Sequence, residues 1–311
     1  MGGGPLAGRR PVRRARPHAG RRFDHARTEH RHELVLPAAR HHRRRTRSTH
    51  RHLRHGHHRR RSGSGIVTVS RILVTGGASG IGAAIARHWA NLGHDVTITD
   101  VNDEAGRDLA SSLGCTYVRL DVRNEEAWRE FASGHETFDV AFLNAGVSTG
   151  DLVFGNPDTS PFTSFDLAAY RRTLGVNVDG VVFGVAHLAP AMVARGSGDI
   201  VVTASMASLY PIPPDPIYGL SKHAVSGFVK SLAPALVERG VCLSAICPFF
   251  VDTPLVPKEQ QAQIRETGFD ILTVDRVVEA AQMAVAERQA GAHWVIFPGA
   301  PIARHPDPTL G

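Results

Sequence analysis

The chain has 311 residues, a formal net charge of +7, 42% hydrophobic residues and three cysteines. The positive charge is concentrated in residues 1–65, which contain 19 Arg, no Lys, 11 His and only three acidic residues, whereas the remainder is acidic. No run approaches about 18 uninterrupted apolar residues, and the longest apolar stretch near the start, 34–39, contains Pro37. These features argue against a membrane span and against a secretory signal.

Residues 1–66 contain Arg and His runs, scattered Gly and Pro, and almost no aliphatic periodicity. Such a composition cannot bury a core and predicts disorder. A polybasic arm could bind nucleic acid or another anionic surface. The lack of Lys beside so many Arg favours a different interpretation, translation of GC-rich DNA upstream of the true start. We therefore expect the native protein to begin near Val67 or Val69, which native peptides from residues 21–60 would contradict.

The first predicted strand, 71–75, leads into the glycine-rich stretch Thr75–Gly82, and a helical pattern follows at 83–89. A strand, a glycine turn and a helix place a pyrophosphate at the helix N-terminus, where free N–H groups and the helix dipole meet negative charge. Gly76, Gly80 and Gly82 would supply the tight turn, the close backbone approach and the helix–strand packing. Alone, such a loop is weak support, because glycine clusters also form plain turns.

A second predicted strand, 95–99, ends at Asp100, eighteen residues after Gly82. An acidic residue at this spacing is the expected partner of the adenosine ribose hydroxyls. Its carboxylate accepts hydrogen bonds from both hydroxyls of NAD and repels the extra phosphate of NADP. The first cation after it is Arg107. The pattern therefore favours NAD, and the competing interpretation is a solvated carboxylate at a strand end.

Tyr218 and Lys222 are four residues apart, which places the phenol and the ammonium on one face of a helix. A nearby ammonium favours the phenolate, so the pair suits acid–base chemistry near neutral pH. Ser205 lies thirteen residues upstream, after the apolar strand that ends near Thr203. Its hydroxyl can donate to a substrate carbonyl or alkoxide.

Taken together, these motifs resemble the short-chain dehydrogenase/reductase (SDR) family in its classical, NAD-dependent form, from about Arg71 to Phe297. The matching motifs, in the family's order, are Thr75–Gly82 with Ser79 and Ile81 in the loop, Asp100, Leu120–Val122, Asn144–Gly146, Asn177, Ser205, Tyr218 with Lys222, and Pro248–Thr253.

The resemblance implies roles for residues that spacing alone does not assign. Asp121 and Val122 would hold the adenine, and Asn144, Ala145 and Gly146 would form the floor beneath the cofactor. Asn177 would join Ser205, Tyr218 and Lys222 in a catalytic tetrad with a water-linked proton relay. Pro248, Val251 and Thr253 would meet the nicotinamide carboxamide and the phosphates.

Two positions depart from the family pattern. Phe249 follows Pro248 where the family often has glycine, and Phe250 lies beside it. A bulky ring at this point would narrow or line the substrate pocket. Leu143 precedes the Asn144 triplet where a second Asn is common, which is a milder change.

Apolar strands alternate with helical patterns throughout the remainder, which predicts parallel βαβ units and a sheet covered on both faces. We therefore expect residues 67–311 to form a single α/β domain with a doubly wound parallel sheet, the Rossmann fold. The predicted strands are 71–75, 95–99, 116–119, 138–143, 199–204, 241–246 and 293–297, and the two long apolar helices are 167–195 and 218–238.

The remaining expectations concern partners and surroundings. The family resemblance implies a homotetramer or homodimer that associates through the two long helices. Three cysteines without a signal peptide are best explained as buried, reduced thiols in a cytoplasmic protein. The histidines outside the tail show no metal-ligand spacing, so we expect no metal. Asp215 and Asp252 are interpreted as polar loop residues.

The expected reaction is reversible oxidation of an alcohol. Ser205 would hold the substrate hydroxyl, Tyr218 as phenolate would remove its proton, and hydride would pass to NAD. The candidate pocket residues are apolar or aromatic, namely Met206, Tyr210, Phe249, Phe250 and Leu255. They favour an apolar secondary alcohol or ketone, alicyclic, steroid-like or derived from a fatty acid, over a sugar.

Two alternatives remain open. An NADPH-dependent reductase, such as a 3-oxoacyl reductase, is disfavoured by Asp100. A cofactor-sensing protein that binds nucleic acid through the basic segment would have little use for a complete tetrad. A cofactor titration would identify the NADPH-dependent reductase. A salt-dependent shift of DNA mobility on binding would identify the nucleic-acid-binding protein.

Overall fold

The computed structural model describes residues 59–62, 65–149 and 166–306. Most of the segment expected to be disordered, residues 1–66, lies outside these ranges. The described part begins with strands β1 (Arg59–Ser62) and β2 (Gly65–Thr68), which pair antiparallel as a separate two-stranded sheet. Paired strands are therefore present before Val67.

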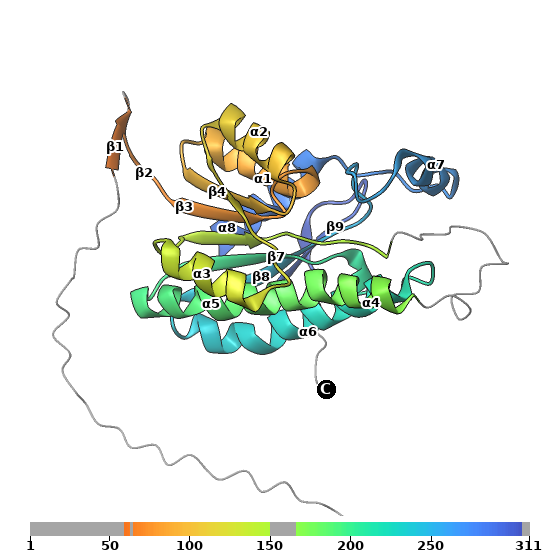
Figure 1. The fold of residues 1–311 in the computed structure, drawn as a ribbon. Coiled ribbons are helices and arrows are strands. Elements are labelled where there is room, and N and C mark those ends of the chain that lie inside the picture. Colours follow the sequence, from red (N-terminus) through yellow and green to blue (C-terminus); the bar gives the residue numbers. More distant parts are fainter. Residues whose placement is uncertain (1–58, 63–64, 150–165, 307–311) are drawn as a thin grey trace, which may run out of the picture. The chain divides into compact units, whose positions relative to one another are not determined.

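An eight-stranded sheet forms the centre of the remaining fold (Figure 1), in the order β10-β9-β8-β7-β6-β3-β4-β5. Every neighbouring pair is parallel except β9 and β10, so an antiparallel strand closes one edge. The strands are β3 (Arg71–Thr75), β4 (Asp95–Asp100), β5 (Thr116–Arg119), β6 (Val140–Leu143), β7 (Gly198–Thr203), β8 (Val241–Pro248), β9 (His293–Ile296) and β10 (Ala303–Arg304).

Helices cover both faces of this sheet (Figure 1). One face carries α1 (Gly80–Asn91), α2 (Asp103–Leu113) and α8 (Val274–Glu287), and the other carries α3 (Glu125–Gly134), α5 (Gly180–Arg195) and α6 (Pro216–Val237). Because both faces are covered, the central strands are mostly apolar, and all residues of β6 and β8 are buried. The predicted doubly wound α/β fold is confirmed.

The strand order reverses at β3, which pairs with β4 on one side and β6 on the other. In open parallel sheets, ligands bind outside the carboxyl ends of the strands at this switch point. The loops that follow β3, β4, β6, β7 and β8 all lie at that edge. The topology thus brings together the motifs that the sequence analysis singled out.

The predicted long helix 167–195 consists of α4 (Leu167–Leu174), a π-helical segment (Gly175–Asp179) and α5. Among the described residues it is the helix whose length and hydropathy would suit a membrane span, although 44% of its most apolar window is buried. Buried core helices meet the same criterion, and Val181, Val185 and Leu188 pack in the core. The π-helical segment contains Asn177, and π-bulges often occur at functional sites.

Candidate active site

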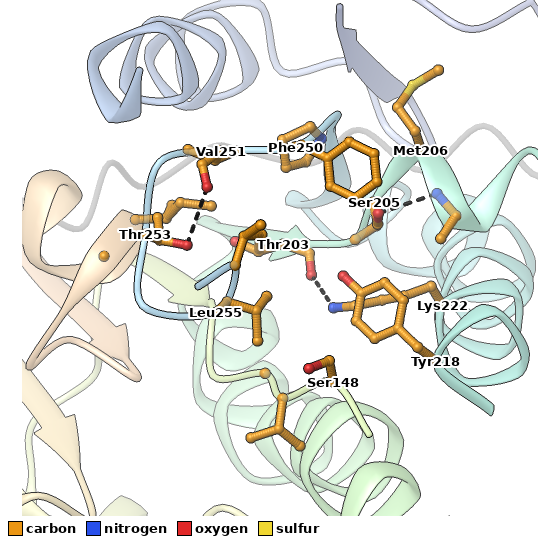
Figure 2. Close-up of a pocket in the computed structure, with 18 of the residues that line it drawn as sticks. Ser148, Thr203, Ser205, Met206, Tyr218, Lys222, Phe250, Val251, Thr253 and Leu255 are labelled. Carbon is orange, nitrogen blue, oxygen red and sulfur yellow. Dashed lines mark hydrogen bonds between the residues drawn. The ribbon is translucent and has the colours of Figure 1, made fainter. Parts of the chain in front are cut away.

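A cavity of about 1310 Å³ opens at the carboxyl ends of the central strands. Its lining includes the glycine loop at one end, the Ser205–Tyr218–Lys222 group in the middle, and a set of aromatic side chains beyond it. Figure 2 shows Ser205, Tyr218, Lys222 and Phe250 among the residues around it. The cavity is therefore long enough to expose both a candidate cofactor site and an apolar pocket.

The glycine loop is packed so tightly that several of its glycines leave no space for a side chain. Gly76 has φ +62°, and a Cβ there would lie 2.7 Å from the Cα of Ala145. A Cβ on Gly82 would overlap the carbonyl oxygen of Gly76, so α1 packs directly on the turn. Gly77 is equally constrained, because its Cβ would lie 2.5 Å from Cγ2 of Ile98, and the sequence analysis did not assign it a role.

The N-terminus of α1 is suited to an anion. Its first turn contains no acidic residue, and the Ser79 side chain makes no capping hydrogen bond, so the first N–H groups keep their donor capacity. Asn144 holds the loop in shape, since its Nδ2 donates to the carbonyl oxygens of Thr75 (3.2 Å) and Gly76 (3.3 Å). This glycine cradle fits the pyrophosphate of a dinucleotide.

Asp100 connects the end of β4 to the glycine loop. Its Oδ2 accepts from the N–H of Ala78 (3.0 Å), and its Oδ1 accepts from the N–H groups of Val101 (2.8 Å) and Asn102 (3.0 Å). The carboxylate lines the cavity. It is thus fixed beside the loop, where a ribose attached to the pyrophosphate would lie.

Asp121 lines the same end of the cavity but already has a partner. Arg123 donates to it from Nε (2.9 Å) and from a terminal nitrogen (2.6 Å), and this pairing holds the pKa of Asp121 below its usual value. The Arg123 guanidinium also lines the cavity. Sequence spacing gave no signal for Arg123, because the pairing arises from a turn after Leu120.

Tyr218 and Lys222 lie on one face of α6, as the spacing predicts. The Lys222 ammonium lies 5.6 Å from the centroid of the Tyr218 ring. It donates to the carbonyl oxygen of Thr203 at 2.9 Å, and Ser205 Oγ accepts from the N–H of Ala207 at 3.1 Å (Figure 2). The ends of β7 and the start of α6 thus place a hydroxyl, a phenol and an ammonium around one point.

Burial opposes charge on both members of the pair. It raises the pKa of Tyr218 to about 12, with hydrogen bonding to Ser205 acting in the opposite direction and the Asp215 carboxylate adding to the rise. Burial also lowers the pKa of Lys222 to about 8. In the protein alone, the contributions that raise the pKa of Tyr218 therefore outweigh the one that lowers it. The expectation that Lys222 and the positive nicotinamide ring together favour the phenolate stays a prediction.

Asn177 lies behind the cavity and is not among the residues that line it. Its buried side chain accepts from the N–H of Val147 (2.8 Å) and donates to the carbonyl oxygen of Val147 (2.9 Å) and to Ser221 Oγ (2.9 Å). The amide is therefore engaged in holding the loop after β6 against α6. The water-linked relay remains a prediction.

The far end of the cavity is aromatic. The Phe249 ring centroid lies 4.7 Å from that of Phe250, 5.2 Å from Phe269 and 4.9 Å from Phe297, and all four line the cavity. The loop that carries Phe249 is tied to the segment with Phe269 by a parallel bridge between Val251 and Leu272. Phe249 thus lines the pocket, as its bulk in place of glycine suggests.

The structure brings most of the predicted site residues together around one cavity. The cavity lining contains every predicted site residue except Gly82 and Asn177. It also contains residues that the sequence analysis did not assign to the site, among them Arg123, Ser148, Arg172, Asp215, Phe269 and Phe297. The capping position before Pro216 was a usable signal for Asp215, which is 1% exposed and so is not a solvated loop residue.

The other reactive side chains are structural. The three cysteines are free, Cys242 and Cys247 are buried, and Cys115 is partly exposed rather than buried. Burial raises the pKa of Cys247 to about 12, so this thiol is a poor nucleophile although it lies beneath Ser205. Within the described residues, no three His, Cys, Asp or Glu side chains are grouped as metal ligands.

Comparisons with known proteins agree with this geometry. Residues 70–264 match the family model described as short chain dehydrogenase. Zerumbone synthase from Zingiber zerumbet is 32% identical over 260 residues, which cover 75% of this chain and 95% of that protein. A borneol dehydrogenase from Lavandula x intermedia is 32% identical over 215 residues, which cover 67% of this chain and 80% of that protein.

A solved structure is similar over the same region. The short chain dehydrogenase/reductase from Burkholderia phymatum in complex with NAD is 28% identical and superimposes with a TM-score of 0.63. The match covers 73% of this chain and 88% of that one.

Proposed function

The chain belongs to the short-chain dehydrogenase family of oxidoreductases, and from that premise we propose that it transfers hydride reversibly between NAD(H) and an apolar secondary alcohol or ketone. One observation carries the proposal. The Tyr218 phenol, the Lys222 ammonium and the Ser205 hydroxyl line one cavity with the glycine loop and the aromatic rings, and β7, which leads to Ser205, lies in the sheet between β3, which leads to the glycine loop, and β8, which leads to Phe249. A substrate carbon and a nicotinamide ring would therefore meet beside these three groups.

The residues of the junction divide the reaction between them. Ser205 hydrogen-bonds the alcohol oxygen, and Tyr218 as phenolate accepts its proton while the carbon loses a hydride. Bound NAD⁺ supplies the hydride acceptor and a positive charge that favours the phenolate. Lys222, whose ammonium donates to the carbonyl oxygen of Thr203, would also donate to the nicotinamide ribose. Asn177 holds the loop after β6 and anchors the water of the proton relay.

The remaining cofactor contacts follow from the cradle. Gly76, Ser79, Gly80 and Ile81 surround the pyrophosphate site at the N-terminus of α1. Thr253 approaches this loop, since a Cβ on Gly80 would lie 3.2 Å from Cβ of Thr253. Val122 and Asp121 would hold the adenine, and Val251 and Pro248 would hold the nicotinamide, since all four residues line the cavity.

We assign NAD over NADP because Asp100 fixes a carboxylate at the ribose site. Three backbone N–H groups hold it in place. A second phosphate at the ribose would meet this fixed negative charge in a partly desolvated cleft, where charge repulsion is weakly screened. The NAD-bound relative supports the same choice.

The substrate is assigned from the aromatic end of the cavity. Phe249, Phe250, Phe269 and Phe297 surround space that a ring system or branched hydrocarbon fills and that a sugar would leave without hydrogen-bond partners. Relatives named as a borneol dehydrogenase and a zerumbone synthase support an apolar substrate.

Assembly and location complete the proposal. Leu167 and Leu220 are exposed on α4 and α6, and we assign these helices to the contacts of a homotetramer or homodimer. Three free cysteines suit a reducing compartment, the cytoplasm.

The test is NADH formation from a panel of alicyclic, steroid-like and linear secondary alcohols, with NAD and NADP supplied separately. NAD-dependent turnover that is lost in Tyr218→Phe, with NADH binding retained, supports the proposal. Tyr170→Phe, on an exposed helix outside the cavity, is the matched control. Turnover in Tyr218→Phe above a few per cent of wild type would refute the assignment of the base.

A further inference from the structure

Asp215 is a buried carboxylate at the cavity wall whose role the proposed reaction does not explain. It is 1% exposed, it lines the cavity, and it forms the N-cap of α6, the helix that carries Tyr218 and Lys222. Burying a charged carboxylate is costly unless hydrogen bonds compensate. A neutral capping residue would serve the helix equally well, so the charge calls for an explanation.

The two oxygens of Asp215 bind two different segments. Oδ1 accepts from the N–H of Tyr218 at 2.9 Å, and Oδ2 accepts from the N–H of Thr149 at 3.1 Å. Arg172 donates to the carbonyl oxygen of Thr149 at 3.1 Å, and Asn177 holds Val147 from the other side. Asp215 therefore joins the loop Gly146–Thr149 to the backbone of the catalytic tyrosine.

That loop forms part of the cavity next to Tyr218. Gly146, Val147 and Ser148 line the cavity, and Figure 2 shows Ser148 near the Tyr218 ring. The loop lies close to the catalytic pair, because a Cβ on Gly146 would be in van der Waals contact with Lys222 Nζ, at 3.6 Å. A shift of Asp215 would thus displace both the tyrosine and the wall that faces it.

We propose that Asp215 is a positioning residue of the reaction, which fixes the loop Gly146–Thr149 to the backbone of Tyr218 and places a negative charge at the start of the helix that carries the phenol. This inference rests on the proposed function, in which Tyr218 is the base. Asp215 does not touch the substrate; it acts through the position and the proton affinity of Tyr218.

The sign of the electrostatic effect follows from the groups around the phenol. Ser205 faces it from the end of β7, Cys247 from β8, Lys222 from α6 and Asp215 from the N-cap. The Asp215 carboxylate raises the pKa of Tyr218, and the hydrogen bond with Ser205 lowers it. Removing the charge of Asp215 should therefore make the phenolate easier to form.

Two variants separate charge from hydrogen bonding. Asp215→Asn keeps the shape and remains a good N-cap, but it loses the charge, and the amide nitrogen that replaces one carboxylate oxygen cannot accept the hydrogen bond made there. We expect the midpoint of the ascending limb of the pH–rate profile for alcohol oxidation to shift to lower pH by about half a pH unit or more. We also expect KM for the alcohol to rise about fivefold as one hydrogen bond is lost. Asp215→Glu keeps the charge and should raise KM while leaving the limb in place.

Asp166→Asn is the matched control, because Asp166 caps α4 by accepting from the N–H of Ala168 at 2.8 Å, is exposed, and does not line the cavity. It should leave both the limb and KM unchanged. An unmoved limb in Asp215→Asn, or an equal shift in Asp215→Glu, would overturn the inference and leave Asp215 as a helix cap.

A second measurement does not depend on turnover. Phenolate absorbance during a pH titration, taken as the difference between each protein and its Tyr218→Phe counterpart, reports the ionisation of Tyr218 alone. Tyr218 should ionise at lower pH in Asp215→Asn than in wild type. If wild type oxidised no alcohol, the proposed function would fail. If the titration of Tyr218 were the same in Asp215→Asn and in wild type, only the inference about Asp215 would be overturned.

Discussion

Lys222 donates its ammonium proton to the carbonyl oxygen of Thr203 at 2.9 Å, although burial lowers the pKa of that ammonium to about 8. Thr203 is the last residue of β7, and its hydroxyl in turn donates to Oδ1 of Asn144 at 3.0 Å. Asn144 holds the glycine turn. Lys222 and Tyr218 in α6 are therefore connected to the glycine loop through the hydrogen bonds of Thr203 and Asn144.

The first prediction concerns this connection. Lys222→Met should preserve the fold, because replacing a buried charge by an apolar side chain of similar length is often neutral. It should lower kcat by about a hundredfold or more, since Tyr218 loses its partner and the nicotinamide ribose loses a donor. Steady-state kinetics and thermal melting check both points. Lys230→Met, on the same helix outside the cavity lining, is the control, and equal losses in both variants would contradict the assignment.

The second prediction concerns the contact between α1 and the glycine turn. Gly82→Ala introduces a Cβ that overlaps the carbonyl oxygen of Gly76 and lies 2.6 Å from Nδ2 of Asn144. We expect a loss of about 1–3 kcal/mol in unfolding free energy and weaker NADH binding, because α1 must move off the turn. Gly134→Ala is the control, since its Cβ meets no atom within 4 Å. NADH affinity in Gly82→Ala equal to wild type would show that the turn tolerates the shift.

The third prediction concerns cofactor choice. Asp100→Ala removes the carboxylate that accepts from Ala78, Val101 and Asn102, so affinity for both cofactors should fall as the loop loosens. The ratio of kcat/KM for NAD to that for NADP should fall by about tenfold or more, because the repulsion of the second phosphate is lost. Asp121→Asn, which acts on the adenine common to both cofactors, should leave the ratio unchanged. If the NAD to NADP ratio were unchanged in Asp100→Ala, Asp100 would not be the residue that selects NAD.

The fourth prediction concerns the pH dependence of stability and Asp199, which lies near the amino end of β7, away from the cavity. Burial raises the pKa of Asp199 to about 6, with Asp139 adding to the rise and Arg288 and Arg195 opposing it. The folded state then binds more protons than the unfolded chain between about pH 4 and 6, so the unfolding free energy falls as pH rises through that window. The change attributable to Asp199 is up to about 3 kcal/mol.

Denaturant titrations at several pH values check this dependence. The free-energy difference between Asp199→Asn and wild type should shift in favour of the variant as pH rises from about 4 to 6. Asp108→Asn, exposed on α2, is the control and should show no comparable shift. A difference that stays flat across the window would mean that Arg288 and Arg195 outweigh burial.

The sheet and the cofactor cradle could be predicted because their signals are local. Apolar strands separated by helical periods specify parallel βαβ units, and the register between β3 and β4 then brings Asp100 beside Ala78 without further information. The spacing of Tyr218 and Lys222 is likewise a property of one helix. These elements depend on short sequence periods that any α-helix or β-strand imposes.

The parts that could not be predicted depend on distant contacts. Phe269 joins the pocket only because Val251 bridges Leu272, and Phe297 joins it because β9 pairs with β8. The antiparallel edge strand β10 has only two residues and no recognisable period. Asp215 resembles an ordinary helix cap until the fold brings Thr149 to its second oxygen. Sequence separation hides each of these contacts.

The aromatic cluster gives the last prediction. Phe249 packs against three other rings at centroid distances of 4.7, 5.2 and 4.9 Å, and together they line the space assigned to an apolar substrate. Phe249→Leu keeps much of the volume but removes the ring contacts, each worth about 0.5–1.5 kcal/mol. Preference for cyclic over linear secondary alcohols, measured as a ratio of kcat/KM values, should fall severalfold while NADH affinity stays the same. Phe138→Leu removes a ring that is stacked on Phe131 in the core, and it should lower the melting temperature without changing that ratio. An unchanged ratio in Phe249→Leu would place the substrate elsewhere in the cavity.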